Sequence, residues 1–299
     1  MNSIGDEIKE SFRNGTAVVK LIYINLAVFL VVNLLYVLVF LMSGASREAY
    51  ETNYLVYLMV HSDLKLLLYR PWTLLTYMFL HFRFLHILFN MLWLFWFGRI
   101  FLHYLTEKQL YTTYLLGGLS GAAIYILSFN VFPAFQYHLP MLGASAAVTA
   151  IIVAISLYNP NYQVNLMFIG PVKIIYIAIV FVLLDLLRIP TSGNAGGYIS
   201  HLGGALYGYL FAMQLKKGKD IGKGFNKSMD AIAALFKPRS KMRVSYRSQA
   251  KNLDDQEYNR RKAATQKEVD KILDKIAKSG YESLSKREKE ILFKMSNKS

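Results

Sequence analysis

The 299-residue chain contains no cysteine. This absence excludes disulfides, cysteine-based zinc sites and a thiol nucleophile. Charge is also scarce over most of the chain: runs of charged residues are missing between Val18 and Leu215, whereas 23 of the 34 Lys and Arg residues follow Leu215. Because 54% of all residues are hydrophobic, too many for a soluble domain of this length, we infer a membrane-embedded body with a basic soluble tail.

The net charge of +15 raises the question of a nucleic-acid partner. No basic motif interleaved with aromatic residues accompanies this charge. A basic segment directly after the last apolar stretch is also what the positive-inside rule expects on a cytoplasmic face. We therefore expect the lipid bilayer, and not nucleic acid, to be the partner of this chain.

Six apolar segments are each long enough to cross a bilayer core about 30 Å thick. They cover residues 18–42, 83–105, 109–129, 141–158, 168–188 and 198–215. The first is longer than the core of a signal peptide, and we interpret it as a retained helix. The sequence thus predicts an all-α, polytopic membrane protein with a six-helix bundle over residues 18–215.

Six spans put both termini on one side of the membrane. Basic residues near the span ends gather on that side, at Lys20, Arg99, Lys173, Lys216 and Lys217, against exceptions at Arg47, Lys65, Arg70 and Arg188. The positive-inside rule then predicts that both termini are cytoplasmic. We also expect a location in the cell's inner, cytoplasmic membrane. The loop at 43–80, which has aromatic and leucine-rich pieces, is predicted to lie in the outer interface.

The polar ends of the chain flank this bundle. Residues 1–17 are predicted to be an N-terminal cytosolic segment, 216–262 a basic linker and 263–299 a cytosolic helical hairpin. Within the hairpin, helices are expected at about 263–278 and 285–296, because Ser285 and Glu288 have the spacing of a capping box. The tail either tunes localisation or a partner contact, or is a solvated hairpin without a separate role.

Four polar side chains stand inside the predicted spans, where each costs a few kcal/mol or more and so suggests a function. They are His86 and Asn90 in the second span, Ser145 in the fourth and His201 in the sixth. All three spans run inward from the outer face, and at 1.5 Å per residue the four residues lie at comparable depth in the outer leaflet. His86 and Asn90, four apart, project from one helix face and can share a target.

Small residues flank Ser145 and His201, and Gly204 and Gly208 form a G-x-x-x-G ridge on the sixth span. Close packing would bring a hydroxyl and an imidazole together, as an activated serine nucleophile requires. No Asp or Glu is near either residue in sequence, so we expect a dyad without a carboxylate. The alternatives are a serine bonded to its own backbone, a histidine that serves as a proton relay, and glycines that serve packing alone.

Three motifs in this order resemble the rhomboid intramembrane serine proteases, over about residues 15–215. The segment from His81 through His86 to Asn90 resembles an H-x-x-x-x-H-x-x-x-N motif of that family. Gly143-Ala-Ser145-Ala resembles its G-x-S-x nucleophile motif, and the stretch 194–204, which contains His201, resembles its histidine motif.

The resemblance implies a role for each matched residue. Ser145 would attack the scissile carbonyl and His201 would take and return the proton. The side chains of His86 and Asn90, with the Ser145 backbone N–H, would stabilise the oxyanion. Gly143 would let the backbone pass close to the reacting carbonyl, and His81 would have a structural role, bridging the first loop to the second span. No metal and no cofactor is expected.

Three positions depart from the usual family pattern. Ala146 stands where glycine commonly follows the nucleophile, which narrows the pocket. Thr73 follows Trp72 where arginine is frequent, which concerns the anchoring of the first loop. Thr149 stands where some members carry an aromatic that stacks on the histidine, so His201 must be oriented otherwise.

The expected substrates are transmembrane proteins, cleaved near the outer leaflet at segments weakened by Gly or Pro. The fifth span, 168–188, and the loop at about 130–140 are the expected gate. One alternative is a catalytically inactive rhomboid-like protein that binds membrane helices. Another is a small transporter that uses the same polar residues as a proton path. The sequence leaves the oligomeric state open.

Overall fold

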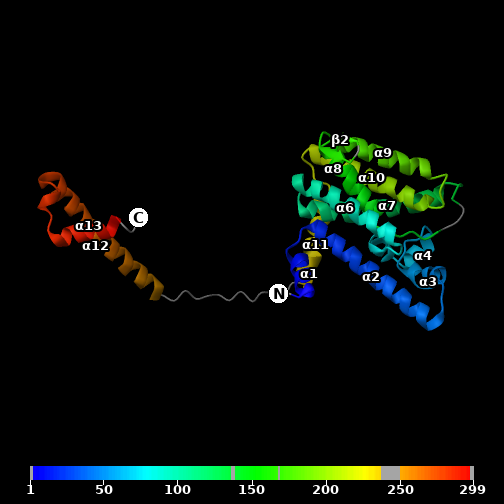
Figure 1. Cartoon of the computed structure of the whole chain (residues 1–299), viewed down its shortest axis with the longest axis horizontal. Helices are drawn as coiled ribbons and strands as arrows, with labels where there is room; N and C mark the ends of the chain where they lie inside the picture. Colours follow the sequence, from blue (N-terminus) through cyan, green and yellow to red (C-terminus); the bar gives the residue numbers. More distant parts are fainter. Residues whose placement is uncertain (1–2, 136–138, 168, 237–249, 297–299) are drawn as a thin grey trace. The chain divides into compact units, whose positions relative to one another are not determined.

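The computed structural model describes residues 3–135, 139–167, 169–236 and 250–296. The chain forms two compact units that divide between residues 236 and 237. Figure 1 shows the first unit as a bundle of long helices and the second as a smaller pair of helices. Each unit is described separately below.

Six long helices form the bundle of the first unit, and each lies within or across one predicted span. They are α2 (Ala17–Ser43), α6 (Phe84–Tyr104), α7 (Glu107–Val131), α8 (Ser145–Tyr158), α9 (Ile174–Arg188) and α10 (Ala195–Lys216). The predicted all-α, six-helix fold class is confirmed. Within the described residues, α2, α6 and α7 are long and apolar enough by themselves to cross a membrane.

Helix α8 is the innermost helix of the bundle, because it contacts α6, α7, α9 and α10. Eleven of its fourteen residues are buried. A helix that is apolar on every side is typical of such a central position. Figure 1 shows α2 and α9 at opposite edges of the same bundle, and α2 accordingly exposes leucine and valine side chains along most of its length.

The predicted fourth and fifth spans begin later in the structure than in the sequence analysis. Residues 141–144 are not helical, and Met141 pairs with Val60 of the first loop through two backbone hydrogen bonds of 2.9 and 3.0 Å. Residues before α9 form a hairpin of β1 (Gln163–Leu166) and β2 (Gly170–Lys173), with Gln163 opposite Lys173. Gly170 has φ 90° and precedes Pro171, two features that oppose a helix here.

The first loop consists of short helices: α3 (Arg47–Asn53), η1 (Leu55–Tyr57), α4 (Leu64–Tyr69), α5 (Thr73–Thr76) and η2 (Tyr77–Phe79). Trp72 anchors this loop, because its indole N–H donates to the Tyr57 carbonyl at 2.9 Å. Thr73, where the family often has arginine, is buried and donates its hydroxyl to the Arg70 carbonyl at 2.7 Å. The Trp-Thr pair therefore holds the loop through hydrogen bonds to its own backbone.

The ends of the chain contain more helix than the sequence analysis expected. Helix α1 (Ile4–Asn14) lies in the N-terminal segment. The expected linker 216–262 contains α11 (Lys223–Phe236) and the start of α12 (Ala250–Ser279), while its residues 237–249 lie outside the described residues. Helix α11 packs on α7, where the Thr112 hydroxyl donates to Asn226 Oδ1 at 2.6 Å. Tertiary contacts with α7 thus support a helix that charge patterning assigned to a linker.

The second unit is a helical hairpin made of α12, η3 (Tyr281–Ser283) and α13 (Lys286–Ser296). The predicted capping box is confirmed, because the Ser285 N–H donates to Glu288 Oε2 at 2.7 Å and the Glu288 N–H donates to Ser285 Oγ at 3.4 Å. Gly280, with φ 77°, allows the turn between the helices. The first helix of the hairpin starts at Ala250 and not near 263.

Candidate functional site

Ser145 is the first residue of α8 and is only half-buried, whereas the residues that follow it are buried. No side chain caps the N-terminus of this helix. The first N–H groups of a helix have no partner within it, so the backbone N–H of Ser145 is available to an acceptor above the helix end. A hydroxyl and an N–H on one residue are therefore presented at the end of a rigid helix.

Gly143 creates the space beside this hydroxyl. Its φ is 127°, a conformation that residues with a side chain rarely adopt. A Cβ at this position would lie 2.8 Å from Nε2 of His86 and 3.7 Å from Oγ of Ser145. Because Gly143 has no side chain, a small space remains at this position, and the side chains of His86 and Ser145 both line it.

Ser145 and His201 lie at the same level of the bundle. A Cβ on Gly121 of α7 would be 2.5 Å from Cβ of Ala146 and 2.8 Å from the carbonyl oxygen of Ser200. Ala146, which follows Ser145, and Ser200, which precedes His201, are therefore both in contact with Gly121. Close contact of this kind needs glycine, because any side chain on Gly121 would separate the helices.

The glycine ridge of α10 brings the same two helices together. A side chain on Gly204 would overlap the Ala146 carbonyl oxygen, and one on Gly208 would lie 2.5 Å from the Ala150 carbonyl oxygen. Both glycines thus lie directly against the backbone of α8. In the part of the chain that the structure describes, no hydrogen bond joins the Ser145 hydroxyl to His201.

A carboxylate accompanies His201, contrary to the expectation of a dyad without one. Oδ2 of Asp185 lies 2.9 Å from Nδ1 of His201. Asp185 belongs to α9 and is 16 residues from His201, so no local spacing linked the two. The available signal was a single acidic residue between leucines in an apolar segment, which by itself suggests a function or a buried partner.

Two aromatic rings flank the His201 imidazole. Phe181 of α9 stacks on it at 6.2 Å between ring centroids with 26° between planes, and Tyr198 meets it edge-on at 5.9 Å. Thr149, at the position where some family members have an aromatic, donates its hydroxyl to the Ser145 carbonyl at 2.8 Å. The aromatic support of the histidine therefore comes from α9 and from α10 itself, and not from α8.

Asn90 lies one helical turn after His86 and is buried. Its amide nitrogen donates to the His86 carbonyl at 2.8 Å, a bond within its own helix. This bond engages one of the two N–H groups of the Asn90 amide, and among the described residues no other acceptor is bonded to it. The predicted pair of donors is thus placed on α6, with His86 bordering the space over Gly143.

His81 has a different contact from the one expected of it. Its Nε2 accepts a hydrogen bond from the Ala144 N–H at 3.3 Å, so it links the segment before α6 to the segment before α8. The ring also meets His86 edge-on at 5.1 Å between centroids. His81 therefore supports the backbone that precedes Ser145.

His81 should make the stability of the protein depend on pH. Burial, with the neighbouring His86 as a second cause, lowers the pKa of His81 from 6.5 to about 3. The fold favours the neutral ring, so this contribution is complete above pH 6.5 and is lost as pH falls towards 3. We expect the melting temperature to fall over this range, and less steeply in His81→Gln. His103→Gln, at an exposed position of α6, is the matched control, and an unchanged slope in His81→Gln would contradict the expectation.

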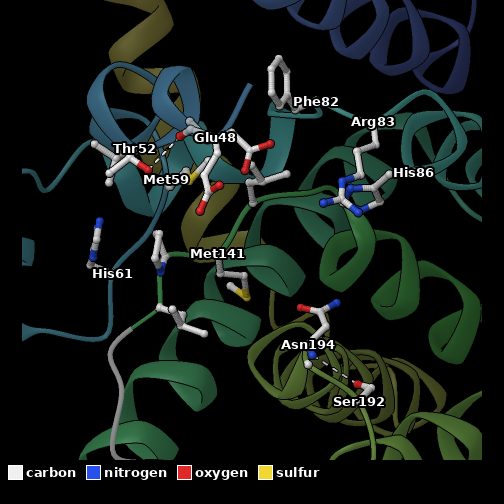
Figure 2. A pocket seen from close by; sticks show the side chains of 16 residues that line it. Glu48, Thr52, Met59, His61, Phe82, Arg83, His86, Met141, Ser192 and Asn194 are labelled. Carbon is white, nitrogen blue, oxygen red and sulfur yellow. Dashed lines mark hydrogen bonds between the residues drawn. The ribbon is translucent and has the colours of Figure 1, made fainter. Parts of the chain in front are cut away.

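A cavity of about 960 Å³ lies on the loop side of the bundle (Figure 2). It is lined by residues of α3, of the segment 82–86, of 139–142 and of 192–194. Of the predicted site residues, all of which the structure describes, His86 is the one that lines it. Figure 2 shows His86 next to Arg83, with Glu48 and Asn194 on other sides of the cavity. Among the described residues, no group of three or more His, Asp or Glu could hold a metal ion.

Comparison with known proteins matches both units. The Rhomboid domain family matches residues 69–218, which include His86, Asn90, Ser145, Asp185 and His201. A family of unknown function, DUF6576, matches residues 253–298. The RHOMBOID-like protein 12, mitochondrial, of Arabidopsis thaliana is 31% identical over 159 residues, which cover 49% of this chain. The chain spans about half the length of that curated relative, since the match covers 47% of it. This chain is a membrane protein that belongs to the rhomboid family.

Proposed function

We propose that this protein is an intramembrane serine endopeptidase with Ser145 as nucleophile and His201 as base. The observation that carries the proposal is the meeting of α8 and α10 over Gly121, next to both residues. A hydroxyl and an imidazole that come from different helices and share one level form the minimal pair for an activated serine. Membership of a family that usually consists of serine proteases supports the same assignment.

The reaction has two stages. Ser145 Oγ attacks the scissile carbonyl carbon while its proton passes to Nε2 of His201. His201 then gives this proton to the leaving nitrogen, the C–N bond breaks and an ester on Ser145 remains. Water then attacks the ester carbon and gives a proton to His201. The bond from this carbon to Ser145 Oγ breaks, His201 passes the proton to Oγ, and the carboxylic acid product leaves.

The oxyanion that forms at each stage needs donors that are already in place. The Ser145 N–H and the side chains of His86 and Asn90 fill this role in our proposal. The position of His86 beside the space over Gly143 supports it. Each such donor lowers the barrier by about 3 kcal/mol, because it acts in a site of low dielectric.

The substrates we propose are transmembrane segments of other proteins. Helix α9 is the proposed gate, together with the loop at about 130–140, of which residues 136–138 lie outside the described residues. The support for α9 is its thin packing: it buries only Ile174, Ala178 and Asp185. Opening of α9 would part Asp185 from His201, so in this proposal α9 returns to the bundle before the chemical step.

The orientation of the protein follows the positive-inside rule in this proposal. Both termini are cytoplasmic, the host is the cell's inner membrane, and the Ser145 end of α8 faces outward. The cavity at His86 then opens to water on the outer side, which supplies the water that hydrolysis consumes.

A fluorophosphonate probe, which reacts with activated serines, tests the proposal. We expect it to label the purified wild-type protein at Ser145, as located by peptide mass spectrometry. His201→Ala should label at least about 10²-fold more slowly, because the base is lost. Absence of labelling in a folded wild-type protein would instead favour an inactive binder of membrane helices. Equal labelling in His201→Ala would exclude His201 as the base, and proton flux into liposomes would favour a transporter.

A further inference from the structure

We propose that Asp185 is a positioning residue that holds His201 in the orientation needed for proton transfer, so that the site works as a serine–histidine–aspartate triad. This inference rests on the proposed protease function. The starting observation is the 2.9 Å distance between Asp185 Oδ2 and His201 Nδ1, which joins α9 to α10.

Both side chains of this pair are shielded from solvent. The Asp185 side chain is 7% exposed and that of His201 is 13% exposed. A carboxylate in such surroundings is costly unless it has a partner that offers a proton. Among the hydrogen bonds of the described residues, Asp185 has one partner, and it is His201.

The chemistry of the contact determines which ring nitrogen is free. An ionised carboxylate only accepts hydrogen bonds, so Nδ1 of His201 carries the proton and donates it. In the neutral ring Nε2 then has a free lone pair, the group that must accept the Ser145 proton. The imidazolium that forms during catalysis is stabilised by the same carboxylate. Asp185 thus both selects the productive tautomer and stabilises the charged intermediate.

The ring orientation is constrained from other directions as well. Phe181, one turn before Asp185 on α9, stacks on the His201 ring, and Tyr198 meets its edge. Stacking limits tilt of the ring, but it does not distinguish Nδ1 from Nε2. That distinction requires a polar partner on one side, and Asp185 provides it.

The test compares three variants of the full chain in detergent with a transmembrane reporter. Asp185→Asn keeps the shape of the side chain but removes its charge, and Asp185→Glu keeps the charge. Asp220→Asn is the matched control, because this aspartate accepts hydrogen bonds from Gln109 and Gly222, away from His201. Melting temperatures of all variants report whether they fold.

We expect Asp185→Asn to lower kcat by about 10²-fold or more, with KM changed less than about threefold, because asparagine keeps the shape of the side chain and so the packing of α9, the proposed gate. The kcat of Asp185→Glu should be at least about tenfold higher than that of Asp185→Asn. Asp220→Asn should keep the wild-type kcat. A second readout is the ¹⁵N chemical shifts of histidine rings, with His201 assigned by their loss in His201→Gln. Wild type should show the Nδ1–H tautomer, and Asp185→Asn should lose this preference.

A kcat within threefold of wild type in folded Asp185→Asn would overturn the inference, as would an unchanged tautomer of His201. A loss of similar size in Asp220→Asn would also overturn it, since the effect would then be structural. Failure of the proposed function is distinguishable from these outcomes. In that case the wild-type protein itself would neither cleave the reporter nor react with the fluorophosphonate probe.

Discussion

Replacing Ser145 with alanine is expected to lower the rate of reporter cleavage by at least about 10⁴-fold. The substitution removes the nucleophile while the backbone N–H of residue 145 remains. Whatever cleavage persists would come from oxyanion stabilisation and binding alone. Single-turnover cleavage of a transmembrane reporter by the purified protein measures the rate directly.

Ser156→Ala is the matched control for this experiment. Ser156 lies on the same helix, is fully buried, and its hydroxyl has no hydrogen-bond partner among the described residues. Its removal should therefore leave both the rate and the melting temperature near wild type. Cleavage by Ser145→Ala at the wild-type rate would end the protease assignment, whatever the control shows.

Gly204→Ala should impair both stability and activity, although it adds a single methyl group. The new Cβ would overlap the Ala146 carbonyl oxygen and lie 2.9 Å from the Ala146 carbonyl carbon. Helix backbone cannot rotate out of the way, so α8 and α10 must move apart. Overpacking of this kind costs about 1–3 kcal/mol. Because Ala146 follows Ser145, a shift of about 1 Å would also slow cleavage about 10²-fold.

Gly224→Ala provides the comparison for Gly204→Ala. Gly224 lies on α11, and a Cβ there would have no atom within 4 Å. We expect wild-type melting and cleavage in this variant, measured in the same detergent. Wild-type behaviour in Gly204→Ala would show that the helices can separate without loss and would remove the packing argument for the site.

The hydropathy pattern predicted the helices well because a span must satisfy its own backbone hydrogen bonds and face lipid. The structure differs from the predicted helices where a segment does not form its own helical hydrogen bonds. Met141 pairs with Val60 of the first loop, and the residues before Ile174 form a hairpin whose second strand begins at Gly170. Such segments are apolar enough to resemble a span, but their backbone groups bond to other parts of the protein.

The site was predictable to the extent that its residues lie in local patterns. His86 and Asn90 are four apart on one helix, and Gly143 precedes Ser145 by two positions, so short motifs describe them. Asp185 belongs to no such motif. Its contact with His201 depends on how α9 packs on α10. The hydropathy pattern does not predict which faces of two helices are in contact.

The sequence by itself determined that this protein has a helical membrane body and a basic tail, and it identified the serine and the histidines that a rhomboid-like site would use. These features follow from apolar length, charge placement and short spacings, which are all local quantities. Only the tertiary structure decided that Asp185 bonds to His201, that His81 bonds to Ala144, and that Phe181 stacks on the imidazole. The physical reason is that these contacts join separate segments of the chain, and side-chain packing across helices selects them.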